Sequence, residues 1–160
     1  MYVSLPSRTL FSDEISDIVI TKLGIKGFRG VYMRDELQRL KTPYNYESGI
    51  VNLNTHTQPG SHWICYAKIG KDLFYFDSFG VYPTDEVIRY LKSKKDYELN
   101  LPRIEYNVEV VQHISSHECG ALCIYVLSEL CMNHRPFSDI IQDLKNRYDS
   151  NKAHKLKIKL

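Results

Sequence analysis

The stretch S-H-W-I-C-Y-A-K-I-G-K-D-L-F-Y-F-D-S-F, residues 61–79, indicates the fold more clearly than any other part of the chain. Its two arms, 61–69 and 73–79, are rich in aromatic and β-branched residues, which favour extended structure. Gly70-Lys71-Asp72 lies between them and is typical of a tight turn. We therefore predict a β-hairpin at the centre of the molecule.

Elements predicted on both sides of this hairpin give the fold class. Further strands are expected over 49–53 and 106–113, and the residues of the latter alternate between apolar and polar. Apolar residues recur at helical spacing after Cys119, which predicts a deeply buried helix. Weaker helix patterns, with Ser12 and Thr84 as expected N-caps, cover 12–23, 34–41, 85–91 and 139–148. The order helix, strands, helix, strand, helix predicts an α+β fold, and without repeats or a linker residues 1–160 form one domain.

His62 and Asp77 lie on opposite arms of the predicted hairpin. If Gly70-Lys71 is the loop, His62 faces Phe79 and Asp77 lies one diagonal step away; if Ile69-Gly70 is the loop, His62 faces Asp77. Both registers place the two side chains on one face within about 5–8 Å, whereas a three-residue loop would separate them. A carboxylate beside an imidazole fixes its tautomer and stabilises the imidazolium. A surface pair without a catalytic role is the alternative.

Cys119 and Gln112 are the other candidate catalytic residues. Cys119 begins the buried helix, where unpaired N–H groups and the helix dipole favour the thiolate. Gly120 and Ala121 leave room for a substrate beside it. Gln112 ends a predicted strand, and its amide can donate a hydrogen bond to an oxyanion. The alternatives are a small core residue for Cys119 and a loop hydrogen bond for Gln112.

A zinc site is the rival chemistry in this region. His113, His117, Cys119 and Cys123 supply four zinc-type ligands. However, Cys123 lies one turn inside an apolar helix and the chain contains no CxxC pair. We therefore predict no metal.

Several motifs together resemble those of a known family. They are Gly60-Ser61-His62-Trp63, Phe76-Asp77-Ser78-Phe79-Gly80, Gln112, and Glu118-Cys119-Gly120-Ala121-Leu122-Cys123. In this order they resemble adenain, the adenovirus maturation protease, and its relatives in virophages and large DNA transposons. The pattern is more distantly similar to the SUMO/ubiquitin-like deconjugases of the same clan.

The resemblance implies a circularly rearranged papain-like fold, with a mostly antiparallel sheet packed against the helix that starts at the nucleophile. It implies Cys119 as nucleophile, His62 as general base and acid, Asp77 as the residue that orients His62, and Gln112 as oxyanion donor. Trp63 and Gly120 are implied to bind substrate in a cleft that favours Gly-rich, small-residue cleavage sites. One departure is Asp77, where adenain has Glu.

The implied function is a viral maturation cysteine endopeptidase that cleaves capsid or other virion precursors. The alternatives are a SUMO/ubiquitin-like deconjugase and an inactive module that binds capsid protein or nucleic acid. No cofactor is required by the expected chemistry, although adenain itself is stimulated by a peptide and by DNA. We expect a monomer that acts in the virion and the host-cell cytoplasm and is not secreted.

Composition and charge agree with a globular protein and single out the C-terminal tail. Apolar residues make up 43% and charged residues 25%, no apolar run is long enough for a membrane span, and four cysteines are too few for a disulfide scaffold. Residues 145–160 carry six Lys or Arg and one acidic residue, a net charge of +5. The basic tail, about 150–160, is therefore expected either to contact DNA or to be a solvated end. Residues 155–160 alternate as an amphipathic strand does, which predicts pairing with a sheet edge of the same or another molecule; a frayed end is the alternative.

Overall fold

The computed structural model describes residues 1–55, 57, 61–92, 94–99, 102–150 and 154–160. Its centre is a five-stranded sheet in the order β2-β3-β4-β5-β6. The three middle strands run antiparallel, and each outer strand is parallel to its neighbour. The strands are β2 (Phe28–Met33), β3 (Tyr46–Asn52), β4 (Trp63–Ile69), β5 (Asp72–Phe76) and β6 (Ile104–Tyr106).

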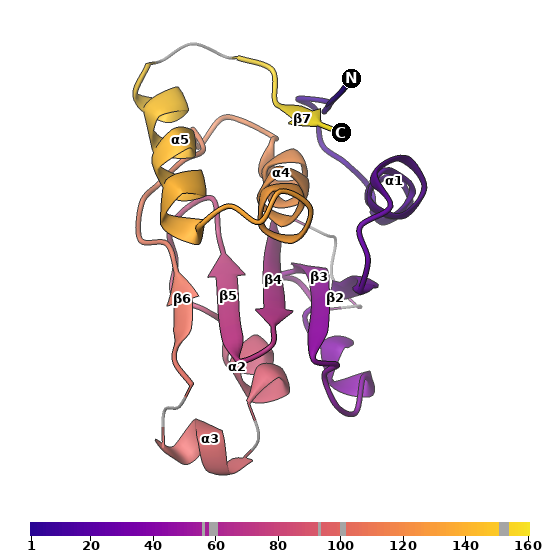
Figure 1. The fold of residues 1–160 in the computed structure, drawn as a ribbon, viewed down its shortest axis with the longest axis vertical. Coiled ribbons are helices and arrows are strands. Elements are labelled where there is room, and N and C mark those ends of the chain that lie inside the picture. The colour runs from indigo at the N-terminus through magenta and orange to yellow at the C-terminus, as the bar shows by residue number, and fades with distance from the viewer. Residues whose placement is uncertain (56, 58–60, 93, 100–101, 151–153) are drawn as a thin grey trace.

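Helices cover both faces of this sheet, and the two chain ends pair with each other (Figure 1). They are α1 (Ser12–Ser16), which continues as the π-helix η1 (Asp17–Leu23), the 3₁₀ turn η2 (Leu37–Arg39), α2 (Asp85–Leu91), α3 (Lys94–Leu99), α4 (Cys119–Cys131) and α5 (Phe137–Asp149). A separate antiparallel pair joins β1 (Tyr2–Ser4) to β7 (Lys157–Lys159). The prediction of an α+β fold is confirmed. Every helix within the described ranges is too short or too polar to cross a lipid bilayer.

The alternation of side chains along β4 builds two cores. Trp63, Cys65 and Ala67 pack with α4 and the N-terminal helix on one face of the sheet. Ile64 and Tyr66 point to the other face, where they pack with α2 and η2. Because successive strand residues face opposite sides, a fully apolar strand must lie between two layers.

The hairpin adopts the first of the two registers considered from the sequence. Cys65 pairs with Phe76 and Ile69 pairs with Asp72, so the loop consists of Gly70 and Lys71. Gly70 has φ +63°, in the left-handed region that a tight hairpin turn requires and glycine enters without strain. This register determines which side chains emerge beyond the end of the sheet.

Three local predictions need correction. Residues 107–113 form no strand: β6 ends at Tyr106, because the Asn107 side chain, rather than its backbone, bonds the backbone of Asp77. Helix α1 is capped by Phe11, not Ser12, since the Glu14 carboxylate accepts a hydrogen bond from the Phe11 N–H at 3.1 Å. The helix expected over 34–41 is only the single 3₁₀ turn η2.

A buried carboxylate ties several elements together on the face of α2. Glu47 of β3 accepts hydrogen bonds from the hydroxyls of Tyr66 (2.8 Å) and Tyr90 (2.8 and 3.0 Å). Arg29 of β2 forms a salt bridge with the same carboxylate at 3.1 Å. The charge is thus paired and hydrogen-bonded, which a buried carboxylate requires.

Candidate active site

The side chains of His62 and Asp77 meet just beyond the end of the β4–β5 hairpin. His62 Nε2 lies 2.9 Å from Asp77 Oδ1, and both side chains are shielded from solvent. Phe79, the residue that the observed register places opposite His62, stacks on the imidazole with ring centroids 4.8 Å apart. The imidazole is therefore held on one face by an aromatic ring and at one nitrogen by a carboxylate.

The backbone around Asp77 is fixed by a residue far away in sequence. Asn107 accepts a hydrogen bond from the Asp77 N–H at 3.1 Å and donates one to the Asp77 carbonyl at 2.6 Å. The Asp77 carboxylate also accepts the Phe79 N–H at 2.8 Å. These contacts hold the carboxylate in one orientation, toward His62.

Cys119 is the first residue of α4, and its sulfur interacts with His62. The helix start brings the positive end of a 13-residue helix to the thiol. His62 and the backbone of Trp63 and Gly120 favour the thiolate and lower the pKa of Cys119. His62 uses Nε2 for Asp77, which leaves Nδ1 for the sulfur.

The pKa values of these two groups shift in opposite directions. Burial alone would lower the pKa of His62, but Asp77 and Cys119 outweigh burial and raise it to about 9. Burial alone would raise the pKa of Cys119, but the hydrogen bond to His62 and the backbone donors outweigh it and lower the pKa. Both shifts favour the thiolate–imidazolium pair over the neutral thiol and imidazole.

Two other cysteines show the opposite behaviour, which separates them from Cys119. Burial raises the pKa of Cys123 well above its ordinary value and that of Cys131 to about 12. The Cys123 thiol donates to the Trp63 carbonyl at 3.4 Å. Cys65 is buried in β4. Cys65 and Cys123 occupy the core positions expected from the sequence, whereas Cys131 is half-buried and packs against the core.

Gln112 is buried beside Cys119, with its amide oriented by two partners. The Ser78 hydroxyl donates to Gln112 Oε1 at 2.5 Å, while Gln112 Nε2 donates to the Ser116 carbonyl at 3.0 Å. A carbonyl only accepts hydrogen bonds, so this pairing defines which end of the amide is nitrogen. One N–H of the amide remains for a group in the cleft, which both Gln112 and Cys119 line.

These residues line a cleft of about 580 Å³. Trp63 forms one wall and is anchored by a hydrogen bond from its Nε1 to the Leu10 carbonyl at 3.1 Å. Gly120 lies beneath this wall: a Cβ there would stand 3.3 Å from Leu10 Cβ and 3.4 Å from Trp63 Cδ1. The cleft thus brings together His62, Trp63, Gln112 and Cys119, with Asp77 and Gly120 directly behind the lining.

Several residues of the site carry no recognisable signal in the sequence. Residues 9–12, preceding and opening α1, and Met33 at the end of β2 also line the cleft. Asn107 and Ser78 support it from behind. The polar residue Asn107, within the strand predicted over 106–113, was the one sequence feature that suggested such a supporting role. Gly60, from the first motif, lies outside the described residues.

The four side chains of the rival zinc site do not converge. His113 stacks on Tyr148 at a centroid distance of 4.4 Å, and Cys123 bonds the backbone of β4. Among the residues the structure describes, no three His, Cys, Asp or Glu side chains are grouped as metal ligands. The geometry therefore favours the thiol–imidazole arrangement over a metal centre.

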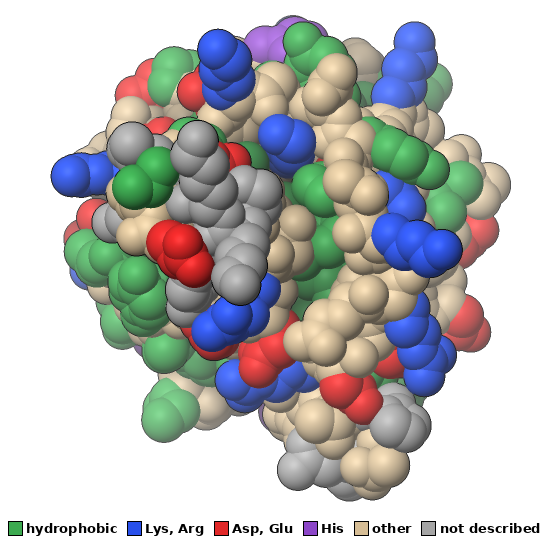
Figure 2. All heavy atoms as spheres, turned by 90° about the horizontal axis from the view of Figure 1, so that it is seen from below, with side chains coloured by type: hydrophobic (Ala, Val, Ile, Leu, Met, Phe, Trp, Pro, Cys, Tyr) green, Lys and Arg blue, Asp and Glu red, His purple; other side chains and the backbone are tan. Residues whose placement is uncertain are grey.

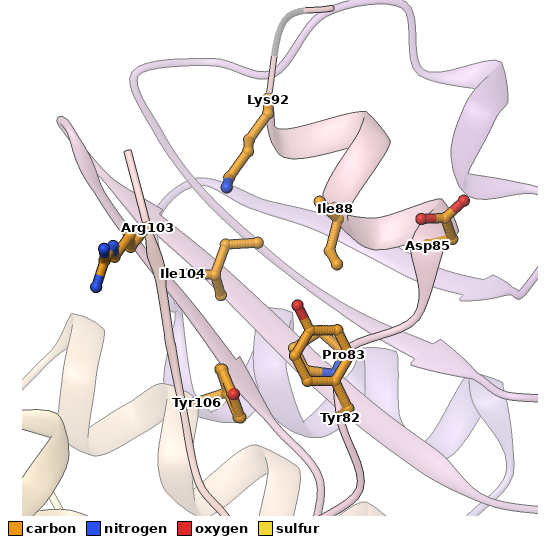
Figure 3. A pocket seen from close by; sticks show the side chains of 8 residues that line it. All are labelled: Tyr82, Pro83, Asp85, Ile88, Lys92, Arg103, Ile104 and Tyr106. Carbon is orange, nitrogen blue, oxygen red and sulfur yellow. The ribbon is translucent and has the colours of Figure 1, made fainter. Parts of the chain in front are cut away.

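A separate cavity of about 550 Å³ lies between α2 and β6 (Figure 3). Tyr82, Tyr106, Ile104 and Lys92 point into it, and none of the described residues that line it is a cysteine or a histidine. The end of the molecule that carries α2 and α3 shows mixed positive and negative side chains around a hollow floored by hydrophobic ones (Figure 2). The described lining of this cavity therefore lacks the thiol–imidazole pair found in the cleft.

Comparison with solved structures relates this fold to a viral protease. Two crystal structures of the ASFV pS273R protease, one of them with selenomethionine, are similar to this chain with TM-scores of 0.59 and 0.55. The similarity covers 89% of this chain and 67% and 68% of the two known chains, at 16% sequence identity in each case. No protein-family model matches the sequence, and no curated protein does. The chain therefore has a papain-like α+β fold, whereas the narrower resemblance to adenain stays a prediction.

Proposed function

We propose that the protein is a cysteine endopeptidase with Cys119, His62 and Asp77 as its catalytic triad. The observation that carries the proposal is the position of His62, between a carboxylate at 2.9 Å and a thiol of lowered pKa. The papain-like fold, shared with a viral protease, supports the same class of reaction.

The reaction begins when the Cys119 thiolate attacks the carbonyl carbon of the scissile peptide bond. The carbonyl becomes an oxyanion, which accepts hydrogen bonds from the Gln112 amide and the Cys119 N–H. The imidazolium of His62 gives its proton to the leaving nitrogen, the C–N bond breaks, and an acyl-enzyme remains. His62 then takes a proton from water, the resulting hydroxide attacks the thioester, and the thiolate leaves.

Small residues, Gly above all, are the proposed preference next to the cut. The indole of Trp63 forms a fixed wall because Leu10 anchors its N–H. A fixed aromatic wall close to the nucleophile leaves little space for a substrate Cβ. Capsid or other virion precursors are the proposed substrates, in keeping with the viral origin of the protease that shares the fold. Activation by a peptide or DNA and action in the virion belong to the same proposal.

The test is cleavage of a Gly-containing peptide by the full chain and by single cysteine variants. Cys119→Ala is expected to abolish cleavage, whereas Cys65→Ala and Cys123→Ala keep most of it, because only Cys119 contacts His62. Iodoacetamide should label Cys119 well below pH 8, at a rate that the other thiols do not reach.

Three results would contradict the proposed nucleophile or favour a different function. Equal loss of activity in all three soluble variants would refute Cys119 as nucleophile. Cleavage of SUMO or ubiquitin conjugates but not of the free peptide would favour a deconjugase. Uniformly slow alkylation, without cleavage, would favour an inactive binding module.

A further inference from the structure

A second cavity, of about 410 Å³, continues from the catalytic cleft. Phe79, Gln112 and Ile114 line both, so the two cavities are neighbours that share these residues as a wall. Val110 and Tyr148 line only the second cavity. The second cavity is therefore adjacent to the catalytic cleft.

The position of His62 indicates which part of a substrate lies nearest the second cavity. His62 protonates the leaving nitrogen, so the departing segment passes on the imidazole side of the cleft. Phe79 stacks on that imidazole and forms the boundary with the second cavity. Trp63 and Leu10, which flank the nucleophile, line the catalytic cleft but not the second cavity. The second cavity thus lies on the leaving-group side.

The walls of this cavity are mostly apolar or aromatic. Val110 is 39% exposed and Ile114 is 94% exposed, so both have apolar surface for a ligand to cover. Tyr148 stacks on His113 with ring centroids 4.4 Å apart, and Lys145 Nζ lies 4.8 Å from the centroid of the Tyr148 ring. None of the described residues lining the cavity is Asp, Glu, Lys or Arg. Burial of apolar surface on such walls favours a large apolar side chain over a charged one.

We propose that this cavity is a specificity subsite that binds a large apolar side chain, such as Leu or Phe, from the leaving segment of the substrate. The proposal rests on the proposed endopeptidase function and extends it. Cleavage sites would then combine small residues before the cut with a large apolar residue shortly after it. A cleft with chemically different walls on its two sides selects among peptide substrates because it binds their transition states with different affinities.

The experiment compares peptides that are identical up to the cut and differ only after it. Leu, Gly or Asp is placed in turn at each of the first three positions after the cut, and kcat/KM is measured. At one position we expect Leu to be preferred over Gly by about tenfold or more. The readout is the ratio of kcat/KM between two substrates. A general loss of activity lowers both values equally and leaves this ratio unchanged.

A matched pair of variants locates the preference on the structure. Val110→Asp places a carboxylate on the wall of the cavity and is expected to remove the preference for Leu. Val108→Asp makes the same change two residues away, at a side chain that is 68% exposed and does not line the cavity. This control variant should keep the wild-type ratio.

The outcomes separate this proposal from the one on which it rests. Cys119-dependent cleavage with equal rates for Leu, Gly and Asp at all three positions would overturn the subsite alone. The same is true if Val110→Asp and Val108→Asp change the ratio equally. If no peptide is cleaved in a Cys119-dependent way, the endopeptidase function itself fails and the subsite with it.

Discussion

A single imidazole, that of His62, links the two charged partners of the site. Asp77 contacts Nε2 of the ring, and Cys119 also raises the pKa of His62, so protonation of the ring stabilises both negative charges. The interaction between the two groups contributes both to the raised pKa of His62 and to the lowered pKa of Cys119. The pair persists between the two pKa values and is lost as the pH rises through about 9, when the imidazolium loses its proton.

Substitution of Asp77 tests this account through pH dependence. In Asp77→Asn the imidazolium loses its carboxylate partner, so the pKa of His62 falls and the ion pair is lost at lower pH. We expect the alkaline limb of the kcat/KM profile to move to lower pH and alkylation of Cys119 at pH 6–7 to slow. Asp72→Asn, on an exposed residue at the other end of β5, is the control. Unchanged profiles in Asp77→Asn would contradict the pairing.

Two connecting segments, rather than regular elements, carry much of the site. The segment after β5 holds Asp77 and Ser78, and the segment between β6 and α4 holds Asn107 and Gln112. Their hydrogen bonds cross between segments: Asn107 to Asp77, and Ser78 to Gln112. Gly80 permits the close approach, since it has φ +69° and a Cβ there would meet the Val108 carbonyl at 2.4 Å. The position of Gln112, the proposed oxyanion donor, therefore depends on contacts between these two segments.

Ser78→Ala tests that dependence. The change leaves Gln112 Oε1 without its buried donor, so the amide is free to rotate away from the oxyanion position. We expect kcat to fall about tenfold with KM nearly unchanged, because the lost interaction forms only in the transition state. Ser48→Ala, at a serine equally buried in β3, is the control and should keep kcat. A rise in KM with unchanged kcat would argue against this positioning role.

At the scale of the whole molecule, the two ends of the chain meet beside α4. The tail pairs in register with the N-terminal strand, Val3 opposite Ile158, and the Leu5 N–H bonds the Leu156 carbonyl at 2.8 Å. Leu156 and Ile158 are buried in the main core, whereas Lys155, Lys157 and Lys159 are exposed. The alternation expected of residues 155–160 is thus observed, and the sheet edge belongs to the same chain. Residues 151–153 of the basic tail lie outside the described ranges.

Ile158→Ser tests whether this closure stabilises the protein. Replacing a fully buried side chain leaves a polar group in a cavity, so we expect the free energy of unfolding to fall by about 2–4 kcal/mol. Urea denaturation measures it, with Lys157→Ser on the exposed face as the control. Equal stability of the two variants would show that the tail contributes little. DNA affinity of Lys157→Ser, measured against salt, tests separately whether the tail contacts DNA.

Local patterns in the chain were enough to predict the hairpin, the helix that starts at Cys119 and the partnership of His62 with Asp77. Each depends on side-chain periodicity or turn chemistry over a few residues, which holds wherever the segment lies. The strand predicted over 106–113 was wrong, because alternation describes a strand only if a neighbouring strand is present to pair with it.

The remaining parts of the site arise from contacts between segments far apart in the chain. Residues 9–12 reach the cleft because Trp63 binds the Leu10 carbonyl, 53 residues away, and Asn107 reaches Asp77 across 30 residues. Such contacts depend on how the layers pack, and no short pattern encodes that packing. For the same reason no short pattern predicts the proposed subsite, whose walls Phe79, Val110 and Tyr148 come from three separate segments of the chain.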